Sequence, residues 1–182
     1  MNDFLLCPKC ASKKIKSVDG RKWQCPDCGF DLYNNTASAV GIIISDKKNS
    51  VLLERRAKDP RKGFLALPGG FVDYDETAED AARRECLEEL ALPVENIQYV
   101  CSYPNTYEYK NIVYKTCDLF FSATPNSIEN IFEKLHFQKA EVSELLLCKI
   151  NTLEDIQNLP LAFESARFAL KIWLEKRQNK NG

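Results

Sequence analysis

Residues 69–92 read GGFVDYDETAEDAARRECLEELAL, and the organisation of the whole chain is best understood from this stretch. It begins with two glycines, which favour a turn, and eight acidic residues fall between Asp73 and Glu89. From residue 77 onward the apolar residues recur with the period of a helix. Those that would face a core stand four residues apart and are Ala78, Ala82, Cys86 and Leu90. The sequence therefore predicts a glycine turn followed by an amphipathic helix.

Another face of this predicted helix carries three glutamates. Glu85, Glu88 and Glu89 stand at positions i, i+3 and i+4, which brings their carboxylates together. Like charges at this spacing destabilise a helix unless a cation neutralises them, and all-oxygen sites suit Mg²⁺ or Mn²⁺. We therefore predict a site for a hard divalent cation. The alternative is a solvated acidic helix that binds no metal.

The stretch resembles the signature of the Nudix hydrolases, G-x5-E-x7-R-E-U-x-E-E-x-G-U, in which U is a bulky apolar residue. The fixed positions that match are Gly70, Glu76, Arg84, Glu85, Glu88 and Glu89, with Cys86 and Leu92 in the two apolar positions. Ala91 stands where the family usually has glycine. Six fixed positions match a given register by chance roughly once in 10⁷, so the resemblance is specific.

The resemblance implies which residues bind the catalytic metal, Mg²⁺ or Mn²⁺. The ligands would be the carboxylates of Glu85, Glu88 and Glu89 and the backbone carbonyl of Gly69. Adjacent glycines allow the backbone to approach a metal closely. A turn without any ligand is compatible with the same local sequence.

The catalytic residues are also implied by the resemblance. Either Glu85 or Glu141 would orient or deprotonate the attacking water, and Glu144 is the second candidate for the additional glutamate. Arg84 would brace the metal-binding glutamates, and Glu76 would pair with Arg84. Divalent cations neutralise a diphosphate and lower the pKa of water. The implied reaction is metal-dependent hydrolysis of the diphosphate linkage in a nucleoside diphosphate derivative.

A segment after the signature partly resembles the motif SQPWPFPxS of the NADH pyrophosphatase branch of the family. Ser102, Pro104 and the aromatic Tyr107 match this motif, whereas its other positions differ. NADH, ADP-ribose or a similar nucleotide is therefore the expected substrate. Arg56 is a candidate for binding phosphate, and Tyr107 and Tyr109 are candidates for stacking on a base or ribose. A solvated loop and ordinary strand residues are the alternatives.

Four of the eight cysteines form two tight pairs near the N-terminus, Cys7 with Cys10 and Cys25 with Cys28. Together they supply four thiolates for a closed tetrahedral Zn²⁺ site, which leaves no position for a substrate and is therefore structural. Residues 19–20, Asp-Gly, are a strong hairpin signal between the pairs. We predict a zinc ribbon. Paired disulfides and a CxxC redox centre are the alternatives.

The chain is expected to contain two domains. A polar, turn-rich segment separates residues 1–33, the zinc ribbon, from residues 34–182, the Nudix hydrolase domain. The fold class is α+β. By resemblance, the second domain would be an α/β/α sandwich with a mixed β-sheet.

The hydrophobic pattern also predicts individual elements. Strands are expected at residues 39–45, 51–54, 64–67, 94–102 and 112–123. The first two of these would form a hairpin. Thr152 and Asp155 predict a capping box at the start of a short helix, and a longer helix follows Pro160. The polar residues from 176 onward predict a frayed end.

Composition limits the partners. The 182 residues carry a net charge of −1, which gives no overall attraction to nucleic acid or anionic membranes. The N-terminus lacks the pattern of a secretory signal, and no apolar run approaches the ~18 residues of a membrane span. We expect a cytoplasmic protein that does not bind membranes and acts on a small nucleotide. The resemblance also allows a homodimer.

Two other functions stay open. The chain could remove a nucleotide cap from RNA with the ribbon as an arm, or it could sense a nucleotide as a nucleic-acid-binding module. Trp23, which lies between lysines of the ribbon, is a candidate for stacking on a base. The complete set of acidic positions favours an enzyme over a sensor.

Overall fold

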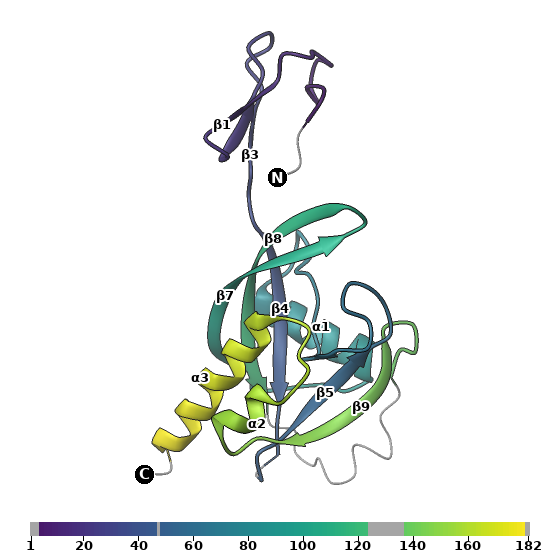
Figure 1. Ribbon diagram of the computed structural model, residues 1–182, viewed down its shortest axis with the longest axis vertical. Coiled ribbons are helices and arrows are strands. Elements are labelled where there is room, and N and C mark those ends of the chain that lie inside the picture. Colours follow the sequence, from purple (N-terminus) through teal and green to yellow (C-terminus); the bar gives the residue numbers. More distant parts are fainter. Residues whose placement is uncertain (1–3, 47, 124–136, 181–182) are drawn as a thin grey trace. The chain divides into compact units, whose positions relative to one another are not determined.

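The computed structural model describes residues 4–46, 48–123 and 137–180 (Figure 1). The chain forms two compact units. The first consists of residues 1–36 and 106–115, and the second of residues 37–105 and 116–182.

The first unit contains a small antiparallel sheet with the strand order β1-β2-β3. Its strands are β1 (Lys16–Val18), β2 (Lys22–Gln24) and β3 (Asp31–Tyr33). Asp19 and Gly20 join the first two strands with φ values of 51° and 66°, which suit a tight two-residue turn. The predicted hairpin is confirmed.

The core of this small sheet is a cluster of buried residues that contains Cys7, Ile15, Trp23 and Cys25. Trp23 is only 7% exposed, and the edge of Phe4 packs on it with 5.1 Å between ring centroids. The indole is therefore part of the core, and the interpretation of Trp23 as a base-stacking side chain is wrong. A core this small rarely stabilises a module without a metal or disulfides.

The second unit holds most of two three-stranded sheets, with the strand orders β4-β8-β7 and β6-β5-β9, whereas the adjoining ends of β7 and β8, within residues 106–115, belong to the first unit. The strands are β4 (Ala37–Ile44), β5 (Ser50–Arg56), β6 (Leu65–Ala66), β7 (Gln98–Tyr109), β8 (Ile112–Ala123) and β9 (Val142–Lys149). β4 and β8 are parallel, whereas β5 is antiparallel to both β6 and β9. The strand pairing is therefore mixed.

The predicted hairpin of residues 39–45 with 51–54 is wrong, because β4 and β5 belong to different sheets. Within the described residues, the single bridge between these segments joins Ser45 to Val51. The backbone N–H groups of Val40 and Ile42 instead donate to the carbonyls of residues 70 and 68. The glycine turn thus occupies the edge of β4 that the hairpin would have used.

Helices cover the sheets on two sides. They are α1 (Ala78–Leu90), α2 (Leu153–Gln157) and α3 (Glu164–Lys180). In β4, Ile42 packs in the same core cluster as α1, whereas its neighbour Ile43 packs in the cluster that contains α3 residues. Alternate residues of the strand thus pack into cores on opposite faces of the sheet. In Figure 1, α3 lies in front of the strands and α1 behind them.

Several element boundaries differ from the sequence prediction. β7 begins at Gln98 and continues to Tyr109, whereas the strand was expected at residues 94–102. β8 spans the predicted residues. α3 extends to Lys180 rather than fraying from residue 176, because the Lys176 ammonium donates to the Val100 carbonyl at 2.7 Å and Arg177 stacks on Trp173.

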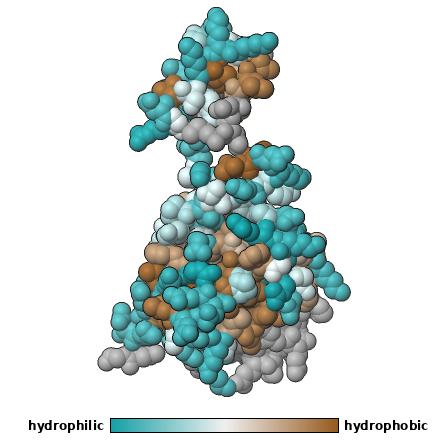
Figure 2. Space-filling view, in the orientation of Figure 1, coloured by the Kyte–Doolittle hydropathy of each residue, from teal (hydrophilic) through white to brown (hydrophobic). Residues whose placement is uncertain are grey.

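The surface visible in Figure 2 is mainly hydrophilic, with smaller hydrophobic areas between the polar residues. Within the described part of the chain, no helix combines the length and the apolar character needed to cross a membrane.

Both ends of α1 have defined caps. The Thr77 hydroxyl accepts a hydrogen bond from the Asp80 amide at 3.1 Å and caps the N-terminus. Ala91 ends the helix with φ = 52°, and its amide donates to the Leu87 carbonyl at 3.0 Å. Alanine thus occupies a left-handed C-cap, a conformation that glycine adopts with less strain. The predicted capping box of α2 is also confirmed.

We expect the substitution Ala91→Gly to stabilise the protein by about 0.5–1 kcal/mol, because glycine relieves the Cβ strain at positive φ. Glycine also adds entropy to the unfolded chain, which reduces the gain. Ala78→Gly, in the first turn of the same helix, is the matched control and should cost up to about 1 kcal/mol. Urea denaturation measures both, and a lower midpoint for Ala91→Gly would contradict the left-handed cap.

Candidate functional site

The glycine turn brings the backbone against β4 and against α1. A Cβ atom at Gly69, where φ is +147°, would lie 2.1 Å from the Val40 carbonyl oxygen. At Gly70 a Cβ atom would lie 2.4 Å from an oxygen of the Glu85 carboxylate. Gly69 therefore requires glycine for packing on β4, whereas a side chain at Gly70 would displace the Glu85 carboxylate.

Two of the three predicted metal ligands on α1 face inward. Glu89 is 6% exposed, and its carboxylate accepts a hydrogen bond from the Gly69 amide at 2.8 Å. The Glu85 side chain is 12% exposed, whereas that of Glu88 is 55% exposed. The structure thus brings Glu85 and Glu89 to the glycine turn and leaves Glu88 at the rim.

Arg84 connects the acidic residues to one another. Its guanidinium donates to both oxygens of Glu76, to Glu85 at 2.8 Å and to Glu88 at 3.3 Å. It also donates to the Phe71 carbonyl at 3.0 Å. The predicted pairing of Glu76 with Arg84 is confirmed. These bonds fix the side chains of α1 relative to the turn.

Glu54, on β5, is a buried carboxylate that the sequence analysis did not select. It is 4% exposed, and its Oε1 atom has no hydrogen-bond partner among the described residues. The available signal was a glutamate two residues after Leu52, on the same face of the strand and directly after the apolar residues 51–53. A charged residue at such a position seldom lies there without a partner.

Burial raises the pKa of each of these inward carboxyl groups. The pKa of Glu89 rises to about 8, because burial and the charges of Glu85 and Glu141 outweigh the hydrogen bond from Gly69. Burial, then the charge of Glu89, raises the pKa of Glu54 well above its ordinary value. Burial also raises the pKa of Glu85. Buried like charges of this kind are stabilised by a bound cation, and oxygen donors are the type that a divalent metal such as Mg²⁺ prefers.

The other predicted glutamates differ in their surroundings. Glu141 precedes β9 and pairs with Lys58, and its charge raises the pKa values of Glu54, Glu85 and Glu89. Glu144 is half-exposed and pairs with Arg55 at 2.7 Å. The structure therefore places Glu141, the first candidate, within electrostatic reach of the inward carboxylates.

The predicted substrate-binding residues fall in both units. Arg56 in the second unit donates to the Pro60 carbonyl at 2.8 Å and lies over the Phe163 ring, and its charge lowers the pKa of Glu54 and of Glu89. Tyr107 and Tyr109 belong to the first unit, with 6.5 Å between their ring centroids. Their contact with substrate stays a prediction.

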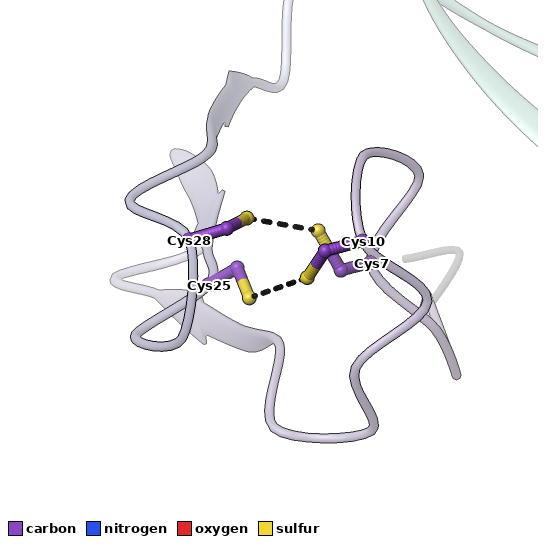
Figure 3. A group of neighbouring side chains, drawn as sticks. All are labelled: Cys7, Cys10, Cys25 and Cys28. Carbon is purple, nitrogen blue, oxygen red and sulfur yellow. Dashed lines mark hydrogen bonds between the residues drawn. The ribbon is translucent and has the colours of Figure 1, made fainter.

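The four N-terminal cysteines form a second site (Figure 3). The sulfur atoms of Cys7 and Cys28 are 3.7 Å apart, as are those of Cys10 and Cys25, and all four lie within 4.8 Å of one another. A disulfide has an S–S bond of about 2.05 Å, so none joins them. Zn–S bonds of about 2.3 Å give tetrahedral edges of about 3.8 Å, which fit this cluster.

The Cys7 thiol is acidified within the cluster. Its burial opposes ionisation, but backbone N–H groups of Cys10 and Lys9 and the neighbouring thiols stabilise the thiolate and lower the pKa to about 7. Metals bind cysteine as the thiolate, whereas hydrogen bonds among the thiols raise the pKa of Cys10 and burial raises that of Cys28, so a metal would have to displace protons from these two.

Comparison with known proteins identifies the larger part of the chain. The NUDIX domain family matches residues 35–171, which include the glycine turn, α1 and β4 to β9. The chain belongs to the NUDIX family.

Curated relatives of this NUDIX chain act on several nucleotides. It is 29% identical over 119 residues to the NAD-capped RNA hydrolase NudC of Haemophilus influenzae, covering 62% of this chain and 45% of the relative. It is 36% identical over 104 residues to the mitochondrial NAD(P)H pyrophosphatase NUDT13 of Mus musculus, covering 55% of this chain and 29% of the relative. It is 44% identical over 82 residues to the ADP-ribose pyrophosphatase of Methanocaldococcus jannaschii, covering 45% of this chain and 44% of the relative. The matches span less than half the length of each relative.

A solved NUDIX structure supports the fold. The NUDIX hydrolase from Nitrosomonas europaea superposes with a TM-score of 0.65 at 26% identity, covering 96% of this chain and 92% of that chain. The predicted α+β Nudix fold is confirmed, and the cysteine cluster is compatible with a small zinc module before it.

We expect the metal-free NUDIX chain to lose stability as the pH rises from about 4.5 to about 8. Glu89 has a pKa of about 8 when folded and an ordinary value of 4.5, so across this window the folded chain holds a proton that the unfolded chain has released. The free energy of unfolding therefore falls with pH and levels off above the folded pKa. Mg²⁺ should restore stability at pH 8–9.

Thermal unfolding in EDTA and in Mg²⁺, from pH 5 to pH 9, measures this effect. Glu89→Gln removes the largest part of this titration and is the control, since it should reduce the pH dependence without metal and leave only the part due to Glu54 and Glu85. If the unfolding temperature changes equally with pH in the variant and in the natural chain, the pKa of Glu89 is not raised.

The cysteine cluster leads to a second expectation. Cys10→Ser should reduce bound zinc from one ion per chain to a small fraction, because three thiolates hold the metal less well than four. The Trp23 emission should shift to the red as the small core opens, measured in a Trp173→Phe background. Cys117→Ser, outside the cluster, is the matched control. Equal zinc contents in the two variants would contradict the site.

Proposed function

We propose that the chain is a two-domain NUDIX enzyme, with a zinc ribbon at residues 1–33 and a catalytic domain at residues 34–182. The reaction is metal-dependent hydrolysis of the diphosphate linkage in a nucleoside diphosphate derivative such as NADH or ADP-ribose. The burial of Glu85 and Glu89 against the glycine turn carries this proposal. Such a group of inward acids suits a divalent cation.

The proposed ligands of Mg²⁺ or Mn²⁺ are Glu85, Glu88 and Glu89 with the Gly69 carbonyl. The Gly69 carbonyl takes no part in the pairing of the turn with β4, which uses the carbonyls of residues 68 and 70 in the described structure. When bound, the cation would neutralise the diphosphate and lower the pKa of water. Glu88, which lies at the exposed rim and pairs with Arg84, would reach the cation from there.

The protein's own residues would position the metal-binding carboxylates and deprotonate the attacking water. The Gly69 amide holds one oxygen of Glu89 and leaves the other for the metal. Arg84 fixes Glu85 through a charge-assisted hydrogen bond and ties it to the Phe71 carbonyl of the turn. Either Glu85 or Glu141 would accept the proton of the attacking water.

The substrate class is supported by what the relatives' names share. NAD(P)H, ADP-ribose and the NAD cap of RNA all contain an adenosine diphosphate joined to a second ribose. An enzyme that recognises this common part would hydrolyse the linkage between its phosphates. Arg56 and the tyrosines Tyr107 and Tyr109 are the proposed contacts to phosphate and base.

Hydrolysis of a nucleotide cap on RNA is a second candidate, because two groups of relatives are named NAD-capped RNA hydrolases. In this case the ribbon would bind RNA through its lysines and the exposed Tyr33, which Lys22 overlies at 5.8 Å. Phosphate contacts make such binding fall steeply with salt.

A zinc-loaded preparation would be assayed with NADH, ADP-ribose, nucleotide sugars, nucleoside triphosphates and NAD-capped RNA, in Mg²⁺, Mn²⁺ or EDTA. We expect metal-dependent release of mononucleotide from one ADP-ribose-containing compound. Glu89→Gln should lower turnover at least about 100-fold, whereas Glu79→Gln, on the exposed first turn of α1, should not.

Two outcomes would count against the proposal. Full turnover by Glu89→Gln in saturating Mg²⁺ would exclude the metal site, and silence across the panel would exclude the substrate class. Preference for capped RNA over NADH, with a steep salt dependence, would favour the second candidate.

A further inference from the structure

Glu54 is the most deeply buried acid near the site, and neither the family signature nor the proposed ligand set includes it. β5 is the middle strand of its sheet, and Glu54 is opposite Ala66 on β6 and Leu145 on β9. Its relative exposure is 4%, and Oε1 has no hydrogen-bond partner in the described part of the chain. A carboxyl oxygen in this state costs free energy unless something binds it.

The side chain points to the α1 side of the sheet. Successive strand residues alternate between faces, and Leu52, two residues earlier, packs in the core cluster that contains Cys86 and Leu90 of α1. Leu145, opposite Glu54 on β9, packs against the same cluster. Glu54 therefore projects toward the helix that carries Glu85 and Glu89.

The charges around Glu54 are mainly negative. Those that act on it most strongly include three acids, Glu89, Glu141 and Glu85, and one cation, Arg56. Arg56 lies over the Phe163 ring and donates to the Pro60 carbonyl, and within the described chain no ion pair joins it to Glu54. A proton on Glu54 would neutralise this group alone and leave the charges of Glu85 and Glu89 unbalanced. A divalent cation would satisfy the group.

We propose that Glu54 is a further ligand of the divalent cation bound by Glu85 and Glu89, supplied by the central strand of the β6-β5-β9 sheet. The inference rests on the proposed function, since it places the cation at the same acidic group. The ligands would then come from the helix, the glycine turn and the sheet. A carboxylate held in a strand has little freedom to move, so it would fix how deeply the cation sits.

Binding of Mn²⁺ to the zinc-loaded full chain tests this directly, by calorimetry or electron paramagnetic resonance, without a substrate. Glu54→Gln keeps the size of the side chain and should weaken Mn²⁺ binding about tenfold or more. The variant should also unfold at a higher temperature without metal, because one buried acid is gone, and should gain less from added Mn²⁺. Glu79→Gln is the matched control and should bind Mn²⁺ like the natural chain.

The outcomes separate this inference from the proposed function. If the natural chain binds no Mn²⁺ at this site, the proposed metal-dependent activity fails. If it binds Mn²⁺ and Glu54→Gln binds equally well, only the role of Glu54 is overturned.

Crystals of the natural chain grown with Mn²⁺ test the inference even if Glu54→Gln does not fold. An anomalous peak within about 2–2.3 Å of a Glu54 oxygen would support it. A metal held by Glu85 and Glu89 with Glu54 outside the ligand shell would overturn it.

Discussion

The hydrogen bond from the Gly69 amide to the buried carboxylate of Glu89 joins three parts of the molecule. The turn can donate it only because glycine lets the backbone lie against the Val40 carbonyl of β4. The same turn brings Gly70 against Glu85, so that a side chain there would displace the Glu85 carboxylate. The sheet edge, the turn and the acidic helix are therefore one arrangement, and the position of each carboxylate depends on the other parts.

Burying several acids together reduces stability, and the chain accepts this cost at its site. Burial and mutual repulsion raise the pKa values of Glu54, Glu85 and Glu89, in the absence of any cation. Arg84 offsets part of the repulsion through its bonds to the acidic residues. Shifts of this kind are typical of functional sites, because an acid that is poorly satisfied alone can bind a cation or a proton strongly.

Local patterns predicted much of the fold. The helix after the glycine turn, the capping box at Thr152, the hairpin at residues 19–20 and the cysteine cluster all follow from short-range spacing. Strand partners did not, because periodicity reports which face is buried and not which strand lies alongside. The turn displaced the expected partner of β4, and Glu54 went unnoticed because its burial depends on β6, β9 and α1 together.

The parallel pairing of β4 with β8 affects the order in which the molecule assembles. Ala37 pairs with Thr116, and the glycine turn and α1 lie between them in the sequence. β5 likewise needs β9, which is later still. Such distant contacts must overcome the entropy of closing long loops before they stabilise anything. On a ribosome the acidic helix would therefore be synthesised well before the sheets that it packs on are complete. Metal binding would then follow the synthesis of β8 and β9.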